Sequence, residues 1–318
     1  MKLNPIVFTL IFFSVMSSAC NSKKSDSEIS SEVGQQSIAV LRQVLATQKE
    51  WVKVHAAEYL IWAGHPEGVR EAYLEEEKLW STKPQYRIGI WRVLAQVAEN
   101  PADKKIWTNK ILDVFLDSSA TDRTHAAETL AKLKISPYEN NILLTEATLK
   151  SPVKPLALYT LWSTAFTSAD SMKSVSEHFL KTVTDVNAES ADRLIPAYAL
   201  RQLKGISEEE SAQLAEAALA EPADSPARIY LLSAAFTNMK GNSAQSEKLH
   251  AEIVKYANSP SKGNISEIAA ALAEKGNVED ISILTPLLTH ASQLESEADR
   301  ADVAAAAAHA ILKINQRE

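Results

Sequence analysis

The stretch WVKVHAAEYLIWAG, residues 51–64, decides the fold class of this chain because its apolar residues follow the period of an α-helix. Within it, His55 and Glu58 stand three residues apart. A second stretch, RTHAAETLAKL at residues 123–133, places His125 and Glu128 in the same frame. The recurring His-Ala-Ala-Glu is either half of a metal or acid–base site or the signature of a structural repeat.

The composition predicts an all-α fold. Glycine is scarce, with 8 residues in 318, and hydrophobic residues make up 46% of the chain. Ala, Leu, Glu and Lys dominate the long segments in helical phasing, and runs of alternating β-branched residues are few. Capping boxes that begin at Ser136 and Ser207 predict helix starts. The short connections between helices are typical of antiparallel helix pairs.

Eight helical segments share one register. Each carries a late apolar residue, and these residues are Leu60, Leu94, Leu130, Leu161, Leu200, Leu232, Leu272 and Ile311. Successive members are 31 to 40 residues apart, which is enough for two helices and two turns. This period predicts an α-solenoid of about eight antiparallel helix pairs, in which each pair contacts only its neighbours.

The first and third of these units resemble the HEAT repeat, in particular its short variety called phycobilisome-lyase HEAT-like. In that pattern a Val-Arg pair precedes two alanines and then a leucine. The matching residues are Val52, Lys53, Ala56, Ala57 and Leu60 in the first unit, and Arg123, Ala126, Ala127 and Leu130 in the third. TPR repeats have nearly the same period and remain the alternative, especially around residues 226–256.

The repeat accounts for the His-Ala-Ala-Glu motif better than a reactive site does. Positions three apart share a helix face, so His55 and Glu58 could converge on one ligand. A zinc site needs three or four ligands, however, and no third donor accompanies either motif. Two copies two periods apart would lie about 20 Å from each other in a stacked array. We therefore expect no catalytic residue, no metal site and no cofactor, and the common nucleotide and hydrolase motifs are missing from the sequence.

The tryptophans suggest where a partner binds, because all six lie between residues 51 and 162. We expect Trp62 to belong to the core and Trp91 to be partly exposed. Arg87 precedes Trp91 by four residues, so its guanidinium can stack on the indole. The candidate binding face consists of Trp51, His55, Arg87, Trp91 and Arg92.

The N-terminus resembles the signal sequence of a bacterial lipoprotein. A short apolar run follows Lys2, and small residues at positions 17–19 lead into Cys20, the only cysteine. The lipobox resemblance implies cleavage after Ala19 and acylation of Cys20. We expect a signal peptide at 1–19, an acylated cysteine and flexible tether at 20–36, and one helical domain at 37–318.

These features predict location better than activity. The resemblance implies a lipid anchor in the bacterial cell envelope, with the outer membrane favoured and the periplasmic or surface-facing side left open. The formal net charge of −7 and the mixed charges argue against a nucleic-acid partner. The leading hypothesis is a non-catalytic scaffold or adaptor that binds another protein or a peptide in a helical-repeat groove. The alternative is an accessory protein of envelope glycan handling, or a lyase-like enzyme, that uses the Trp-rich N-terminal units.

Overall fold

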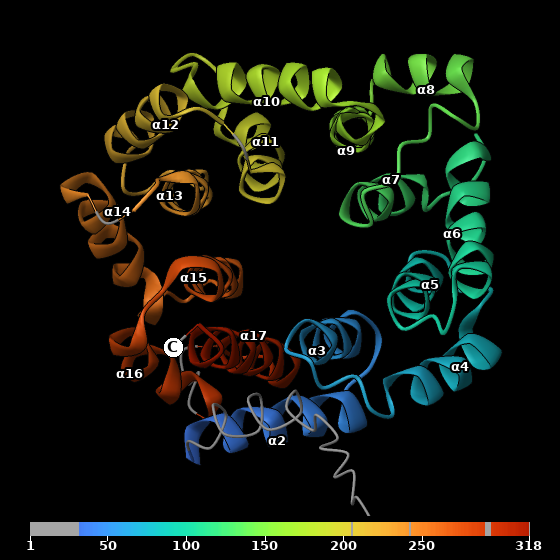
Figure 1. Ribbon diagram of the computed structural model, residues 1–318, viewed down its shortest axis with the longest axis horizontal. Helices are drawn as coiled ribbons and strands as arrows, with labels where there is room; N and C mark the ends of the chain where they lie inside the picture. Colours follow the sequence, from blue (N-terminus) through green and yellow to red (C-terminus); the bar gives the residue numbers. More distant parts are fainter. Residues whose placement is uncertain (1–31, 205, 242, 290–293, 318) are drawn as a thin grey trace, which may run out of the picture.

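The computed structural model describes residues 32–204, 206–241, 243–289 and 294–317. All regular secondary structure in these ranges is helical, which confirms the all-α prediction. The helices form a ring with two layers, because inner and outer helices alternate along the chain (Figure 1).

The eight inner helices of the described chain surround the centre of the ring. They are α3 (Glu50–Trp62), α5 (Tyr86–Gln96), α7 (Arg123–Lys132), α9 (Lys154–Thr164), α11 (Ser190–Leu203), α13 (Arg228–Asn238), α15 (Lys262–Lys275) and α17 (Glu297–Asn315). All eight segments that share the register in the sequence are inner helices. Seven of their late apolar residues are fully buried, and Leu161 alone among them is half-buried.

The outer helices cover the inner ones on the side away from the centre (Figure 1). They are α2 (Glu32–Thr47), α4 (Val69–Trp80), α6 (Pro101–Leu116), α8 (Ile142–Leu149), α10 (Ala169–Thr184), α12 (Glu208–Ala220), α14 (Ala244–Val254) and α16 (Ile281–Leu284). Short 3-10 segments complete the connections, namely η1 (Ala165–Thr167), η2 (Lys255–Asn258), η3 (Val278–Asp280) and η4 (Thr285–Leu288).

The expectation that each helix pair contacts only its neighbours along the chain is wrong, because the ring is closed. Helix α17 packs against α15 and also against α2 and α3, at the other end of the chain (Figure 1). Six alanines of α17 are buried, and their small side chains allow this close approach. The side-chain amide of Gln316 also donates to the carbonyl of Ala63 at 2.7 Å.

The close approach of α3 and α5 depends on a glycine. A Cβ atom at Gly89 would lie 2.8 Å from Val54 Cγ2 and 3.2 Å from the Trp51 ring. Both distances are at or below the limit of ordinary packing, so a larger residue would push the two helices apart. The neighbouring alanines Ala56 and Ala57 of α3 are fully buried, as small residues at a helix contact should be.

The two predicted capping boxes have different outcomes. Ser207 Oγ accepts a hydrogen bond from the Glu210 amide, and the Glu210 carboxylate accepts one from the Ser207 amide, so this box is confirmed. The prediction at Ser136 is wrong, because residues 136–141 form a turn. Helix α8 begins after Asn141, whose side chain accepts from the Leu144 amide at 2.9 Å and caps the helix instead.

The N-terminal predictions fall mostly outside the described residues. The signal peptide and Cys20 lie entirely outside them. Helix α2 begins at Glu32, so residues 32–36, expected in the flexible tether, are helical instead. Leu41 and neighbouring apolar residues of α2 pack on the rest of the ring, which explains why this segment is ordered as a helix. Within the described ranges, no helix is both long enough and apolar enough to span a membrane.

Closure of the ring predicts that an enlarged α17 destabilises the whole protein. Ala308 is fully buried in α17, and Ala251 is exposed in α14. Ala308→Leu should reduce the free energy of unfolding by about 1–3 kcal/mol, because the neighbouring helices leave no room for the added methyl groups. Ala251→Leu is the matched control and should change stability little. Urea denaturation followed by circular dichroism measures both, and equal midpoints for the two variants would contradict a tightly closed ring.

Candidate functional site

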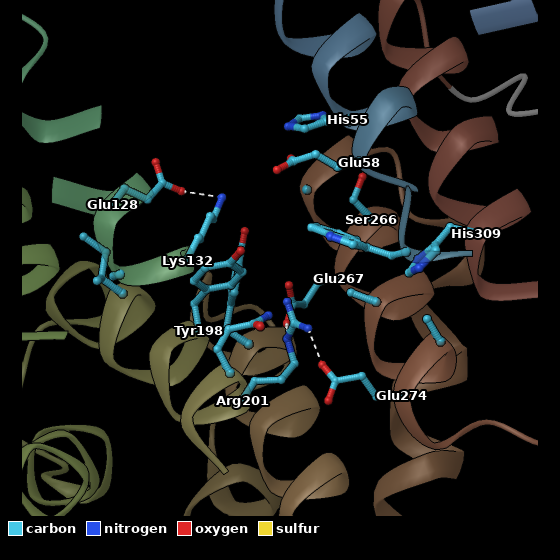
Figure 2. Close-up of a pocket in the computed structure, with 18 of the residues that line it drawn as sticks. His55, Glu58, Glu128, Lys132, Tyr198, Arg201, Ser266, Glu267, Glu274 and His309 are labelled. Atoms are coloured by element: carbon cyan, nitrogen blue, oxygen red, sulfur yellow. Dashed lines mark hydrogen bonds and ion pairs between the residues drawn. The ribbon is translucent and has the colours of Figure 1, made fainter. Parts of the chain in front are cut away.

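A cavity of about 780 Å³ lies at the centre of the ring. Seven of the eight inner helices line it, the exception being α5. Figure 2 shows side chains of α3 and α7 and those of α11, α15 and α17 pointing toward one another across this space. The inner surface of the ring is therefore the wall of one central, solvent-accessible cavity.

One position of the shared register contributes a residue to the cavity wall from each of seven inner helices. The residue two places before each late apolar residue is turned about 200° around its helix, to the opposite face. These residues are Glu58, Arg92, Glu128, Tyr159, Tyr198, Tyr230, Ala270 and His309. All of them except Arg92 line the cavity, and Arg92 is bonded to Glu58. The period that buries one face of each inner helix thus points the other face at the centre.

The first charged cluster is a buried ion pair between α3 and α5. Arg92 donates two hydrogen bonds of 2.7 Å to the two carboxylate oxygens of Glu58, and both side chains are almost inaccessible to solvent. Gln96 also donates to Glu58 at 2.8 Å. Burial alone would raise the pKa of Glu58, but the charges of Arg92 and Lys132 and the bond from Arg92 hold it below its ordinary value. Glu58 is therefore ionised, and both of its carboxylate oxygens accept hydrogen bonds from the protein.

The second cluster surrounds the ring of Tyr198 on α11. Lys132 Nζ lies 5.6 Å from the centroid of this ring, and Arg201 Cζ lies 5.1 Å from it. Two cations therefore make cation–π contacts with the same tyrosine ring. Lys132 pairs with Glu128 at 2.7 Å on α7. Arg201 pairs with Glu267 on α15, its Nε atom lying 2.9 Å from a carboxylate oxygen.

The carboxylates of this second cluster differ in their proton affinity. Burial on its own would raise the pKa of Glu128. The charges of Lys132 and Arg92 outweigh this effect, and the pKa of Glu128 is lowered. Burial dominates at Glu267, where the neighbouring charge of Glu274 adds to it, and the pKa of Glu267 is raised. Arg201 also donates to Glu274 at 2.6 Å, so α11 is tied to α15 by two carboxylates.

The third cluster lies at the closure of the ring. His55 Nδ1 on α3 is 2.7 Å from Asp302 Oδ1 on α17, and Lys262 Nζ on α15 is 3.3 Å from Asp302 Oδ2. Burial would raise the pKa of Asp302, but the hydrogen bond and charge of His55 and the charge of Lys262 lower it. The imidazole of His55 is about one-third exposed and faces the cavity, so it can contact a ligand there.

Three aromatic side chains form a stack beside this third cluster. The rings of Tyr59 and His309 are nearly parallel, with centroids 4.7 Å apart. Trp62 packs edge-on against both and donates from Nε1 to Gln96 at 2.8 Å. Burial, together with the charges of Lys313 and Arg201, lowers the pKa of His309 to about 3, so this imidazole is neutral at ordinary pH.

The candidate binding face predicted from sequence does not form one surface. Trp51, His55 and Arg92 do lie together, since the Arg92 guanidinium is 5.5 Å from the Trp51 ring and the Trp51 and His55 rings are 6.5 Å apart. Arg87 and Trp91 lie elsewhere, on the side of α5 that faces α6 and the start of α7. There, Arg87 pairs with the fully buried Asp122 and lies 5.6 Å from the Trp91 ring centroid, as the four-residue spacing predicts.

The assignments of Trp62 and Trp91 are reversed relative to the prediction. Trp91, expected to be partly exposed, is only 6% exposed, whereas Trp62, expected in the core, is 45% exposed. Trp62 lies two positions after Leu60 and so points toward the ring centre, while Trp91 is enclosed between α5 and α6 with Lys110 over its face. A neighbouring arginine is therefore no sign of exposure here, because the guanidinium itself covers the indole.

The two His-Ala-Ala-Glu motifs lie closer together than the stacked array predicted. Trp51 stacks on His125 with ring centroids 5.5 Å apart and also contacts His55, so one indole bridges the two motifs. Side chains of α3 and α7 meet over α5 because Gly89 leaves room for Trp51. Among the described residues, no group of three or more His, Cys, Asp and Glu side chains is arranged to hold a metal ion. The alanines of both motifs are fully buried, and both glutamates line the cavity.

Most of the cavity residues were missed by the sequence analysis, although a signal for them exists. The register of eight late apolar residues was recognised, and counting back two positions from each would have identified one wall residue on each of seven inner helices. Pairing between distant positions, such as His55 with Asp302, has no such signal because 247 residues separate the partners. No protein-family model matches the chain, and no curated protein matches its sequence.

The reversed tryptophans lead to a prediction about stability. Trp91→Ala should reduce the free energy of unfolding by about 3–5 kcal/mol, because it leaves a cavity between α5 and α6. Trp62→Ala should cost much less, since nearly half of this side chain is in contact with solvent. Thermal melting of the two variants distinguishes these roles, and an earlier transition for Trp62→Ala would show that the exposures are assigned the wrong way round.

The buried Glu58–Arg92 pair predicts a pH-dependent stability. The pKa of Glu58 is lowered from its ordinary value of 4.5, so the pair stabilises the fold above about pH 4.5 and loses this effect as the pH falls further. Glu58→Gln should cost about 3–5 kcal/mol at neutral pH, because Arg92 is left charged and unpaired.

The control for the pair is the double variant Glu58→Gln with Arg92→Met, which removes the unpaired charge and should recover part of the loss. Chemical denaturation of the wild type and both variants between pH 3 and pH 7 measures the effect. The difference between wild type and Glu58→Gln should shrink toward the acid end, whereas a constant difference would mean that ionised Glu58 is not the cause.

Proposed function

We propose that this protein is a non-catalytic binding protein that holds a short polar ligand in the cavity at the centre of its ring. The observation that carries the proposal is the convergence of charged and aromatic side chains from seven inner helices on one central cavity. Its volume of about 780 Å³ is within the range of pockets that bind small ligands.

The size of the cavity narrows the kind of partner. A folded protein is far larger than a cavity of about 780 Å³, so a whole protein domain could not enter the ring. A protein partner would therefore present a chain end or a short loop, and a glycan would present a few sugar units. This proposal keeps the partner classes expected from the sequence, but it moves their contact site from a face of units one to three to the central cavity.

The state of the carboxylates supports binding rather than catalysis. Glu58, Glu128 and Asp302 all have lowered pKa values and are paired with cations, so at neutral pH they are anions that cannot donate a proton. Glu267 has a raised pKa but is engaged by Arg201. Such fixed and paired groups are suited to holding hydroxyl or amide groups of a ligand in place.

We also propose that the ring is built from HEAT-like repeats. The alanine pairs 56–57 and 126–127 are fully buried at helix contacts, where the repeat pattern requires small residues. The regular alternation of inner and outer helices supports a repeat origin for all units. TPR-like units remain the alternative for residues 226–256.

The location is proposed on the sequence of the N-terminus alone. We propose that Cys20 is acylated and anchors the protein in an envelope membrane, with the outer membrane favoured. Cys20→Ala should then release the protein from the membrane fraction, because the acyl chains supply the anchoring energy. Cell fractionation and labelling with radioactive palmitate measure this, and label that persists in the variant would exclude acylation at Cys20.

A variant that fills the cavity tests the proposed function. Ala270 on α15 faces the cavity and is not part of the buried core, so Ala270→Trp should occupy the space without disturbing the ring. Ala251→Trp places the same side chain on the exposed outer helix α14 and is the matched control. Native mass spectrometry of protein purified from its own cells should show a bound molecule on the wild type and on the control variant. A molecule retained equally by Ala270→Trp would show that it binds outside the cavity.

A further inference from the structure

We infer that the ligand of the central cavity is a short neutral oligosaccharide. The inference rests on the proposed function, since it names the class of molecule that the cavity holds. Three properties of the wall support it independently: the balance of its charges, the free hydroxyl groups of its tyrosines and the exposed aromatic face of Trp62.

Most charged side chains of the cavity wall are paired with one another. The pairs are Glu58 with Arg92, Glu128 with Lys132, Arg201 with Glu267 and Glu274, and Lys262 with Asp302. A charged ligand would have to break one of these pairs or be buried without a counter-charge, and both are costly. A sugar hydroxyl both donates and accepts, so it can bridge the two members of a pair and leave the charges balanced.

Two lysines of the wall have no carboxylate partner in the described part of the chain, and they do not form an anion site. Lys134 is exposed in the turn that follows α7, and Lys313 on α17 donates to the side chain of Gln316 at 3.1 Å. Helices α7 and α17 are not neighbours in the ring, so the two ammonium groups come from separate parts of the wall (Figure 1). An anionic ligand is usually held by cations that converge on it.

Four tyrosines of the wall offer hydroxyl groups that the protein does not use. They are Tyr59, Tyr159, Tyr198 and Tyr230, and none of their hydroxyls makes a hydrogen bond to another group of the described residues. Burial and nearby carboxylates raise the pKa of Tyr59 and Tyr230, so these two hydroxyls stay protonated and can donate as well as accept. A hydroxyl-rich ligand is the natural complement to such a set.

Trp62 adds a flat apolar surface to this polar wall. Its indole is fixed by Gln96, which is itself bonded to Glu58, and it rests against Tyr59 and His309. The face of an aromatic ring is electron-rich and attracts the polarised C–H groups on one side of a sugar ring. A pyranose can therefore stack on Trp62 while its hydroxyls reach the paired charges beyond.

The experiment measures binding of defined oligosaccharides to the protein purified from its own cells. The probes are neutral tetrasaccharides of the cello, malto, xylo and chito series, with tetragalacturonate as an acidic probe and an N-acetylated tetrapeptide amide as a peptide probe. Isothermal titration calorimetry should show binding of at least one neutral tetrasaccharide and none of the acidic probe.

The variants assign the binding to the cavity. Trp62→Ala should weaken binding of that tetrasaccharide about tenfold, and Tyr230→Phe, which removes one hydroxyl, about fivefold. Trp80→Ala is the matched control, because Trp80 is also 45% exposed but lies on the outer helix α4, and it should leave affinity unchanged. Ala270→Trp should abolish binding.

The outcomes separate the two proposals. Binding of the acidic or the peptide probe that is lost in Ala270→Trp would overturn the neutral oligosaccharide and leave the cavity as the binding site. Binding of a tetrasaccharide to the wild type and to Ala270→Trp alike would overturn both proposals. Failure of all four neutral tetrasaccharides to bind would overturn this inference alone.

Discussion

The packing of α17 against both ends of the chain is the contact on which the rest of the structure depends. This helix contacts α15, which precedes it, and α2 and α3, which begin the described chain. Its buried alanines bring four helix backbones close together, so the contact is sensitive to any added volume. An open array of the same helix pairs would expose its concave face along its whole length. Because α17 joins the two ends, that face becomes the wall of a single cavity.

Ion pairs reinforce this closed arrangement and define the site together. His55, Asp302 and Lys262 link α3, α17 and α15 across the closure, and Arg201 links α11 to α15 past the intervening α13. Pairs of this kind contribute little net free energy when they are buried, but removal of one partner is costly because the other charge remains. The same side chains therefore hold the inner helices in position and present fixed polar groups to the interior. Rigid placement of this kind favours ligand binding, since less conformational entropy is lost when the ligand arrives.

Aromatic residues are divided between two roles by their place on the helix and not by their neighbours in sequence. Trp62 and Trp91 both lie on inner helices, yet one faces the centre and the other faces the outer layer. The difference is their register relative to the buried leucine of each unit, since Trp62 follows Leu60 by two positions and Trp91 precedes Leu94 by three. About 100° of helical rotation per residue turns this offset into opposite environments. Cationic neighbours such as Arg87 occur on both faces and carry no information on exposure.

The sequence by itself determined the helical class, the eight inner segments and their common register, because these depend on local propensity and on a period of 3.6 residues. The same register also contained one residue of the cavity wall on each of seven inner helices, at the position two residues before the late apolar residue. Only the tertiary structure decided that the array closes, since closure depends on the small rotation between successive units added up over the whole ring. It therefore also decided that His55 meets Asp302, that Trp51 bridges the two His-Ala-Ala-Glu motifs and that the binding surface is an interior. Contacts between residues so far apart in the chain arise from the geometry of the assembled helices, and no local pattern encodes them.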